Sequence, residues 1–127
     1  MNRTFVAVLA VAFLPLPALS QGMTKAHDLL EDIKVTQSAT EDANNFRPLS
    51  DAVKMKVEHA SSYVVGLCDA WNSDSPGFVP SRVGWLEVMG AIRKYIEAHP
   101  EREKELAAKV ARQAVLETYH RRDHNTR

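Results

Sequence analysis

Two histidines near the C-terminus have the spacing of metal ligands on one face of a helix. His120 and His124 are four residues apart, and the carboxylate of Asp123 stands beside the second histidine. A metal site needs a further ordered ligand, whereas two arginines separate these residues within a chain terminus. We therefore expect no metal site, and we expect residues 120–127 to form a solvated polar tail.

The other residues that could act as acids, bases or nucleophiles form no recognisable catalytic arrangement. Asp69 falls in a predicted helix and Asp74 in a predicted loop, so the sequence defines no geometry for acid–base catalysis by this pair. Ser61 and Ser62 lack the flanking glycines of a hydrolase nucleophile elbow. The remaining histidines fall on three different predicted elements: His27, His59 and His99. The sequence thus predicts a protein that is not an enzyme and uses no cofactor.

Apolar residues that recur every three or four positions predict a helical chain. The first helix spans residues 24–35, with Thr24 as N-cap, and the polar segment 36–48 is expected to be a loop. Ser50 caps a second, longer helix, in which Gly66 suggests close contact with a neighbouring backbone. The apolar stripe of this helix comprises Val53, Val57, Ala60, Val64, Leu67 and Trp71.

Two more helices are expected after the helix-breaking segment 72–80. Ser81 is the predicted cap of the third helix, which must end near His99 because a proline follows it. Its apolar stripe comprises Trp85, Val88, Met89, Ile92, Tyr95 and Ile96. The fourth helix is predicted to begin at Pro100 and to turn its inner stripe toward the core, with Leu106, Ala107, Val110, Ala114, Val115 and Thr118. The fold class is therefore all-α: one domain, residues 21–119, of about four helices around one core.

The first twenty residues have the order of a secretory signal peptide. Arg3 supplies a positive charge, an apolar run follows, and small residues stand at Ala18 and Ser20. The alternative is a membrane anchor, but residues 5–19 number only 15 and contain two prolines, whereas a span needs about 20 apolar residues. We expect export, cleavage before Gln21 and no membrane anchor in the mature form.

The composition of the mature chain excludes two kinds of partner. The whole chain has 16 basic and 16 acidic residues, so removal of Arg3 leaves 15 against 16, a net charge of −1. This balance argues against nucleic acids and anionic lipid surfaces as partners. Cys68 is the only cysteine, so no intrachain disulfide can form, and its apolar neighbours predict a buried thiol rather than an interchain bond.

The segment 72–80 is the best candidate for a binding loop. It contains Phe78 beside a Pro-Gly turn, with Trp71 at its entrance and Trp85 just past its exit. Two interpretations stay open. Either the three aromatic residues cap one end of the core, or they serve as anchors in a protein interface, where such side chains carry much of the binding energy.

Three sequence segments resemble the Rap/Tai family, the immunity proteins of type VI secretion amidase effectors. They are the opening His27-Asp28-Leu29-Leu30-Glu31, the helix segment Ser62-Tyr63-Val64-Val65-Gly66, and the junction Lys94-Tyr95-Ile96-Glu97-Ala98-His99-Pro100-Glu101. The resemblance covers residues 26–119, and the His99-Pro100 junction is its most specific part. The chain departs from the family's paired cysteines, because the corresponding positions read Ile33, Ala60, Val79 and Tyr119 or His120.

This resemblance implies a periplasmic protein, commonly a homodimer, that occludes the cleft of a peptidoglycan-cleaving amidase with a protruding loop. The residues expected to bind the amidase are Trp71, Asp74, Ser75, Gly77, Phe78 and Trp85. Two other classes stay open: a helical periplasmic stress chaperone, and an orphan envelope protein of the same fold.

Overall fold

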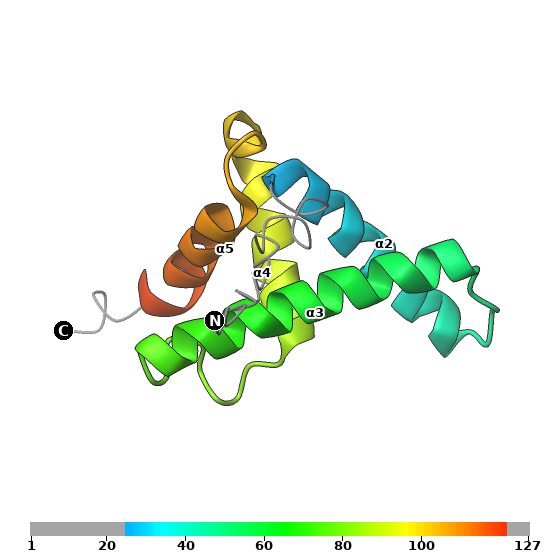
Figure 1. The fold of residues 1–127 in the computed structure, drawn as a ribbon, viewed down its shortest axis with the longest axis horizontal. Coiled ribbons are helices and arrows are strands. Elements are labelled where there is room, and N and C mark those ends of the chain that lie inside the picture. The colour runs from blue at the N-terminus through cyan, green and yellow to red at the C-terminus, as the bar shows by residue number, and fades with distance from the viewer. Residues whose placement is uncertain (1–24, 122–127) are drawn as a thin grey trace, which may run out of the picture.

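Four α-helices and two short helical segments form the part of the chain that the computed structural model describes, residues 25–121 (Figure 1). They are α2 (Ala26–Asn44), α3 (Asp51–Asp74), α4 (Trp85–Ala98), the 3₁₀ turn η1 (Pro100–Arg102), α5 (Ala107–Val115) and the π-helical turn η2 (Leu116–His120). No strand occurs in residues 25–121, which confirms the all-α prediction. The predicted signal peptide, Thr24 and the last six residues lie outside the described part.

Helix α2 is longer than predicted. The segment 36–48 was expected to be a loop, but α2 continues to Asn44. The hydroxyls of Thr36 and Thr40 donate to the carbonyls four residues earlier, at 2.8 and 2.9 Å, and so satisfy their polar groups within the helix. Thr36 is only 1% exposed and Ala39 is also buried, so small side chains extend the buried stripe beyond the large apolar residues.

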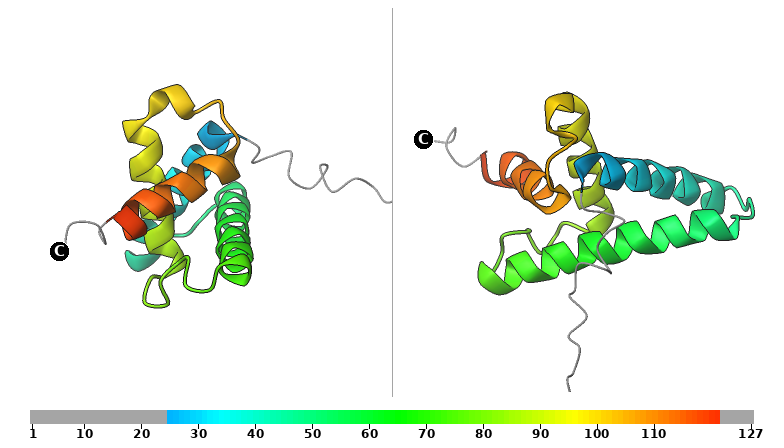
Figure 2. Two further views of the ribbon diagram at one scale, coloured as in Figure 1. Left: turned by 90° about the vertical axis from the view of Figure 1, so that its left-hand side faces the viewer. Right: turned by 45° about the horizontal axis from the view of Figure 1, so that its top comes forward.

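The chain turns sharply between α2 and α3, in a segment that we call the elbow (residues 45–50). Phe46 has a positive φ of 57°, as a helix C-terminal cap often requires. Its N–H donates to Ala43 O at 3.1 Å, and Arg47 N–H donates to Asp42 O at 2.8 Å. These bonds fix the elbow at the far end of the α2–α3 pair, as Figure 1 and Figure 2 show.

Helix α3 begins as the sequence predicts. Ser50 Oγ accepts a hydrogen bond from Val53 N–H at 3.3 Å, which confirms this residue as N-cap. Ala60 and Val64 are buried, and the other members of the predicted stripe are half-buried. The helix ends at Asp74, three residues further than expected.

The prediction that Gly66 makes a close packing contact is wrong. Gly66 is exposed, and a Cβ built on it would meet no atom within 4 Å. The predicted stripe is correctly phased, but the glycine lies on the opposite, solvent-facing side of α3. Overpacking by a larger side chain is therefore not expected at this position.

Replacing Gly66 by alanine is expected to stabilise the protein by about 1 kcal/mol, because alanine has the higher helix propensity and nothing obstructs its methyl group. Urea unfolding of Gly66→Ala beside the original protein measures this difference. Gly77→Ala is the opposing control, since Gly77 has a φ of +80° and should lose stability on substitution. A loss of stability in Gly66→Ala would mean that another surface contacts this glycine.

Helix α4 matches the predicted stripe except at Trp85, which is 39% exposed, and it begins later than its predicted cap. Gly84 rather than Ser81 is the N-cap, and Ser81 lies exposed in a turn. The buried residues of α4 are Val88, Met89, Ile92, Tyr95 and Ile96, all of them predicted.

The fourth helix does not begin at Pro100. Residues 100–102 form η1, a turn follows, and α5 starts at Ala107. The carbonyls of Glu103 and Glu105 in this turn accept hydrogen bonds from His27 N–H and Ala26 N–H, both at 2.9 Å, and so cap α2. Because these carbonyls bind the start of α2, the turn does not continue as part of α5.

The inner stripe of the fourth helix also differs from the prediction. Leu106 is 59% exposed and Thr118 is exposed, whereas both were predicted to face the core. Ala111, which was not predicted, is buried.

The core lies where α2, α3, α4 and α5 meet. α2 packs against α3 in the antiparallel pair, and α4 and α5 pack against its inner end (Figure 2). Leu29, Ile33, Val64, Met89 and Ile92 are among the fully buried side chains there. This arrangement leaves two connections projecting from opposite ends of α3: the elbow and the segment 75–84 (Figure 1).

Candidate functional site

The exposed part of the predicted binding loop is a short turn, which we call the loop tip (residues 74–77). Asp74 ends α3, Ser75 is its C-cap, and all four tip residues are exposed. Ser75 N–H donates to Trp71 O at 2.8 Å and Phe78 N–H donates to Ser75 O at 2.9 Å. Gly77 provides the positive φ, +80°, that the turn needs. The loop tip thus has a backbone held by hydrogen bonds, and it exposes the polar side chains of Asp74 and Ser75.

Phe78 does not belong to the exposed tip, so its prediction as an inserted anchor is wrong. Its side chain is only 7% exposed and packs on the half-buried Trp71, with ring centroids 5.6 Å apart. The guanidinium carbon of Arg112 lies 5.0 Å from the Phe78 ring centroid, and the His120 ring lies 5.1 Å away. The alternative interpretation, in which Trp71 and Phe78 cap one end of the core, is therefore correct for these two residues.

A hydrogen bond from His120 links the loop to η2 near the C-terminus. Its Nε2 lies 2.7 Å from Phe78 O, and because a carbonyl only accepts, this nitrogen carries the proton that is donated. The prediction that the solvated tail begins at His120 is wrong for this half-buried residue. A second hydrogen bond holds the loop from the other side of the chain: Asn72 Oδ1 accepts from Val79 N–H at 2.9 Å.

Sequence reasoning missed Asn72, Arg112 and His120 as supports of the loop. His120 is 42 residues from Phe78 in the chain, and no local pattern signals such a contact. Asn72 alone offered a local signal, since an asparagine at a helix end often binds nearby backbone groups.

Trp85 is 39% exposed and stands at the rim of an open cavity of about 330 Å³, the α3–α4 cavity. The cavity lies between the second half of α3 and the segment that leads into α4. Its lining consists of Val65, Cys68, Asp69, Asn72, Val79, Pro80, Ser81, Val83, Gly84 and Trp85. None of these residues belongs to the loop tip, so the tip and the cavity are two separate features.

Cys68 is half-buried in the wall of this cavity rather than fully buried as predicted. Burial raises the pKa of its thiol, and the neighbouring Asp69 carboxylate raises it further. The thiolate is the nucleophilic form of cysteine, so this environment makes the thiol a poor nucleophile at neutral pH.

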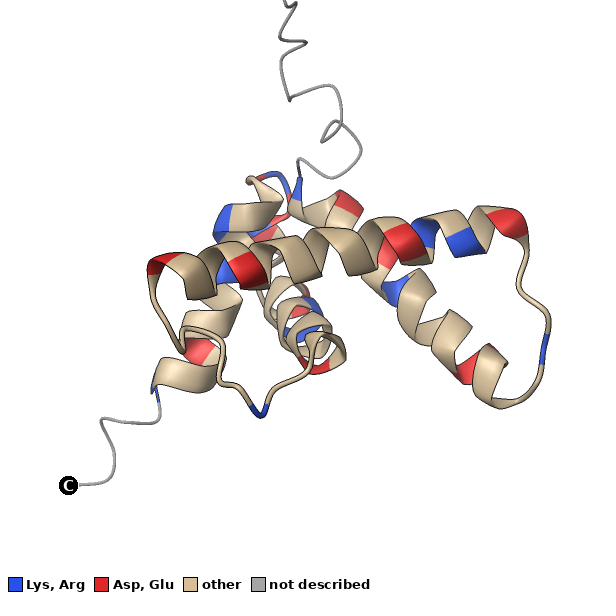
Figure 3. Ribbon diagram, turned by 60° about the horizontal axis from the view of Figure 1, so that its bottom comes forward, with Lys and Arg blue, Asp and Glu red and all other residues tan. Residues whose placement is uncertain are grey.

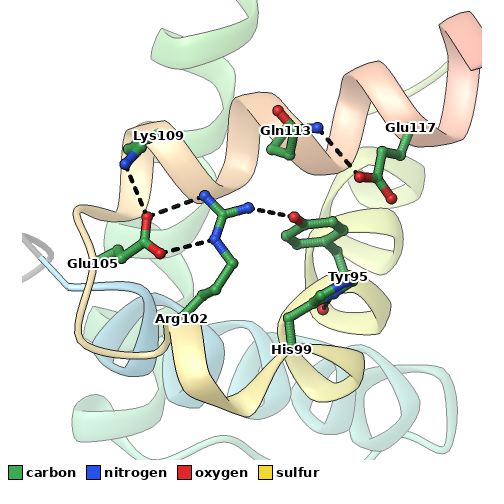
Figure 4. A network of polar contacts seen from close by, with 7 residues as sticks. All are labelled: Tyr95, His99, Arg102, Glu105, Lys109, Gln113 and Glu117. Atoms are coloured by element: carbon green, nitrogen blue, oxygen red, sulfur yellow. Dashed lines mark hydrogen bonds and ion pairs between the residues drawn. The ribbon is translucent and has the colours of Figure 1, made fainter.

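A second cavity, of about 510 Å³, lies beside α4 and η2 and is lined by Tyr95, His99, Glu87 and Glu117 among others. Tyr95 and His99 stack with ring centroids 4.2 Å apart, and His99 Nδ1–H donates to Tyr95 O at 2.8 Å. The Tyr95 hydroxyl accepts from Arg102 (Figure 4). Tyr95 and His99 are thus already engaged within the protein.

Arg102 links this cavity wall to the turn before α5. Its guanidinium forms two hydrogen bonds to Glu105, at 2.9 and 3.0 Å, and Lys109 approaches the same carboxylate at 3.1 Å (Figure 4). The hydrogen bonds from Arg102 and Lys109 lower the pKa of Glu105 to about 2, and the same pairing raises the pKa of Arg102. Since all three charges are paired, the network holds η1 and α5 together.

We expect this network to contribute stability that disappears in acid. Glu105 has a lower pKa in the folded protein than its ordinary value of 4.5, so its contribution is complete above about pH 4.5 and is lost as the pH falls toward 2. The difference in unfolding free energy between the original protein and Glu105→Gln should shrink over this interval. Glu101→Gln, at an exposed residue of the same segment, is the control. A difference that stays constant down to pH 2 would contradict the network.

The described residues offer little further chemistry. No group of three His, Cys, Asp or Glu side chains between residues 25 and 121 is placed to hold a metal ion. In the same range, no helix is both long and apolar enough to cross a bilayer. Asp123 and His124, the remaining members of the C-terminal histidine motif, lie outside the described part.

Comparison with known proteins adds no assignment. No family model, curated protein or solved structure matches the chain. The resemblance to the Rap/Tai family therefore depends on the sequence segments alone, and the function has to be argued from the exposed features of the fold.

Proposed function

We propose that this chain is a non-catalytic periplasmic immunity protein that binds a peptidoglycan-cleaving amidase and covers its active-site cleft. The observation that carries this proposal is the loop tip, an exposed turn whose flanking residues are fixed inside the protein. The sequence resemblance supplies the class of partner, and the loop tip supplies a surface suited to entering a cleft.

Preorganisation favours this role. Binding pays for the ordering of flexible loops, and a loop that is already fixed avoids that loss. Here Phe78 and Val79 are buried directly after the tip. The hydrogen bond from Val79 N–H to Asn72 and the one from His120 to Phe78 O hold them in place. The backbone of the loop tip therefore already has one conformation before a partner binds.

The side chains of the tip suit a polar catalytic cleft. The Asp74 carboxylate and the Ser75 hydroxyl are exposed and can accept hydrogen bonds. An amidase with a catalytic Cys–His pair offers donors and, when its histidine is protonated, a positive charge. A carboxylate that becomes buried against such a group contributes strongly to specificity.

Trp85 is the remaining candidate for direct contact among the predicted aromatic residues. Trp71 and Phe78 pack against one another inside the protein and support the tip from beneath. Trp85 keeps part of its ring exposed at the start of α4, where it can add apolar contact at the edge of an interface.

The substitution of the family's cysteines is compatible with the proposal. Ile33, Ala60 and Val79 stand where the resemblance places family cysteines, and all three are buried in the core. Apolar packing thus occupies positions that disulfides would otherwise cross-link. This supports retention of a rigid domain without disulfides, although a disulfide typically contributes about 2–4 kcal/mol.

The test is inhibition of an exported amidase. The purified protein is added to the peptidoglycan amidase whose gene lies nearest its own, and cleavage of peptidoglycan peptides is followed. We expect inhibition at a fixed stoichiometric ratio at neutral pH. Absence of inhibition, with apolar surface that becomes exposed only in acid, would instead favour the stress chaperone.

A further inference from the structure

The cavity of about 510 Å³ between residues 87–99 and residues 117–119, which we call the α4–η2 cavity, has a floor of small side chains. This floor is one face of α4, where Gly90, Ala91 and Ala98 recur at helical spacing. A Cβ built on Gly90 would meet no atom within 4 Å, so the space above the floor is open. The volume lies within the range of pockets that hold small ligands.

The opposite wall of the α4–η2 cavity is the π-helical turn η2. Such turns are rare in proteins and occur frequently at functional sites. Glu117, Thr118 and Tyr119 of this turn line the cavity, and Tyr95 and His99 line it from the side of α4. Figure 4 shows three of these residues, Tyr95, His99 and Glu117. The cavity therefore has aromatic groups in both walls.

Charged groups of both signs line the α4–η2 cavity. Glu87 and Lys94 are exposed on α4, and neither forms an ion pair with another of residues 25–121. Glu117 differs, since it lies 3.5 Å from Arg121 and accepts a hydrogen bond from Gln113 at 3.2 Å. Glu87 and Lys94 are therefore the charges that a ligand can pair with.

The charges of the lining, rather than a charged region of the surface, determine what this cavity binds. Acidic and basic positions are interspersed over the helices of residues 25–121 (Figure 3). The carboxylates of Glu87 and Glu117 disfavour an anionic ligand such as a nucleotide, and the ammonium of Lys94 disfavours a purely cationic one. A ligand with one positive and one negative group can form a charge-assisted hydrogen bond with both Glu87 and Lys94.

Tyr119 adds an aromatic surface at the Glu87 end of the cavity. Burial raises the pKa of the Tyr119 hydroxyl, and the nearby charge of Glu87 raises it further. An ammonium group beside Glu87 can therefore also contact the tyrosine ring, an arrangement that favours cations. The Glu87 end is thus suited to the positive group of the ligand.

The spacing of Glu87 and Lys94 indicates the length of the ligand. Seven positions separate them, so they lie on the same face of α4, about 10 Å apart along its axis. An extended peptide of three residues spans about 10 Å from its ammonium to its carboxylate. We infer that the α4–η2 cavity binds a short peptide with both termini free, its ammonium at Glu87 and its carboxylate at Lys94. The inference does not depend on the proposed function, because the loop tip lies outside the cavity lining.

Titration of trialanine into isotope-labelled protein, followed by amide chemical shifts, tests the inference. We expect saturable shifts at Gly90, Ala91 and Tyr119, with a dissociation constant below about 0.5 mM. N-acetyl-trialanine and trialanine amide each lack one terminal charge and should bind at least tenfold more weakly. No saturable shift up to about 30 mM trialanine, or equal binding of the free and blocked peptides, would overturn the inference.

Matched substitutions assign each peptide terminus to its side chain. Lys94→Gln should weaken the binding of trialanine at least tenfold, but it should change the binding of trialanine amide by less than twofold, because this peptide has no carboxylate. Glu87→Gln should give the same pattern with N-acetyl-trialanine. Both residues are exposed, so circular dichroism should report an unchanged fold. An equal loss for free and blocked peptides would contradict the assignment and overturn the inference.

A substitution in the cavity floor tests where the peptide binds. Gly90→Leu fills the open space and should weaken trialanine binding at least tenfold. Gly66→Leu is the matched control, because Gly66 is a helical glycine of α3 with equally open surroundings, and it should bind the peptide as the original protein does. Unchanged binding by Gly90→Leu would overturn the inference. Shifts at the cavity residues that arise with the amidase but not with the peptide would assign the cavity to a protein interface and also overturn it.

Discussion

Replacing Phe78 by alanine is expected to lower the free energy of unfolding by about 3 kcal/mol. The side chain is 7% exposed, and its loss removes contacts with Trp71, Arg112 and His120 at one end of the core. Chemical denaturation at low protein concentration measures the effect. Phe46→Ala is a matched control, because the same substitution at a 97% exposed position should change stability by less than about 0.5 kcal/mol.

Equal stability of the two alanine variants would contradict the structure at this loop. It would mean that Phe78 faces solvent, and the prediction of an inserted aromatic anchor would regain its basis.

The packing of Phe78 also determines how many C-terminal residues can be deleted without loss of stability. A deletion that starts after Arg121 keeps the bond from His120 to the Phe78 carbonyl, whereas one that starts at His120 removes it.

The second large effect concerns the proposed interface. Ser75→Arg should weaken amidase binding by about 2 kcal/mol or more, equivalent to about 30-fold, because a long charged side chain then occupies the tip that enters the cleft. Ser75 is exposed, so the substitution leaves the buried supports of the loop intact. The inhibition constant for peptidoglycan cleavage measures the loss.

Ser73→Arg provides the control for this experiment. Ser73 is also exposed and lies on α3 just before the loop tip, so the same new side chain is introduced outside the tip. Its inhibition constant should stay within about threefold of the original value. If both variants inhibit as well as the original protein, the loop tip has no part in the complex.

Local sequence patterns were sufficient for the start of α3 and for the buried stripes of α3 and α4. The Ser50 cap and the stripe through Ala60 and Val64 are short-range features, and the structure contains both. The buried residues of α4 follow a regular three-and-four spacing, which the sequence displays directly. The all-α fold class follows from the same periodicity.

The errors arose where tertiary contacts decide the local structure. Thr36 and Ala39 look polar or small in the sequence, yet both become buried when α2 packs against the other helices. The turn before α5 is held by bonds to the start of α2 and by the Arg102–Glu105 pair. These partners are distant in the chain or depend on side-chain geometry, so no spacing rule anticipates them.

The sequence predicted a loop after α3 but not which of its side chains are exposed. Ser75 and Gly77 lie exposed in the turn where the prolines and the glycine indicated a loop, whereas Asp74 is the last residue of α3. Phe78 was assigned to solvent because its sequence neighbours are turn residues. Its burial depends on Arg112 and His120, more than thirty residues away, which pack against it only in the folded chain.

Amide hydrogen exchange of the complex with the amidase tests the central claim most directly. We expect peptides that cover residues 72–78 to exchange at least tenfold more slowly when the amidase is bound, since the loop tip then lies inside its cleft. The exchange rates of peptides from the elbow should be the same with and without the amidase. Unchanged exchange at residues 72–78, with protection elsewhere on the protein or nowhere, would contradict the proposal that this loop occludes the enzyme.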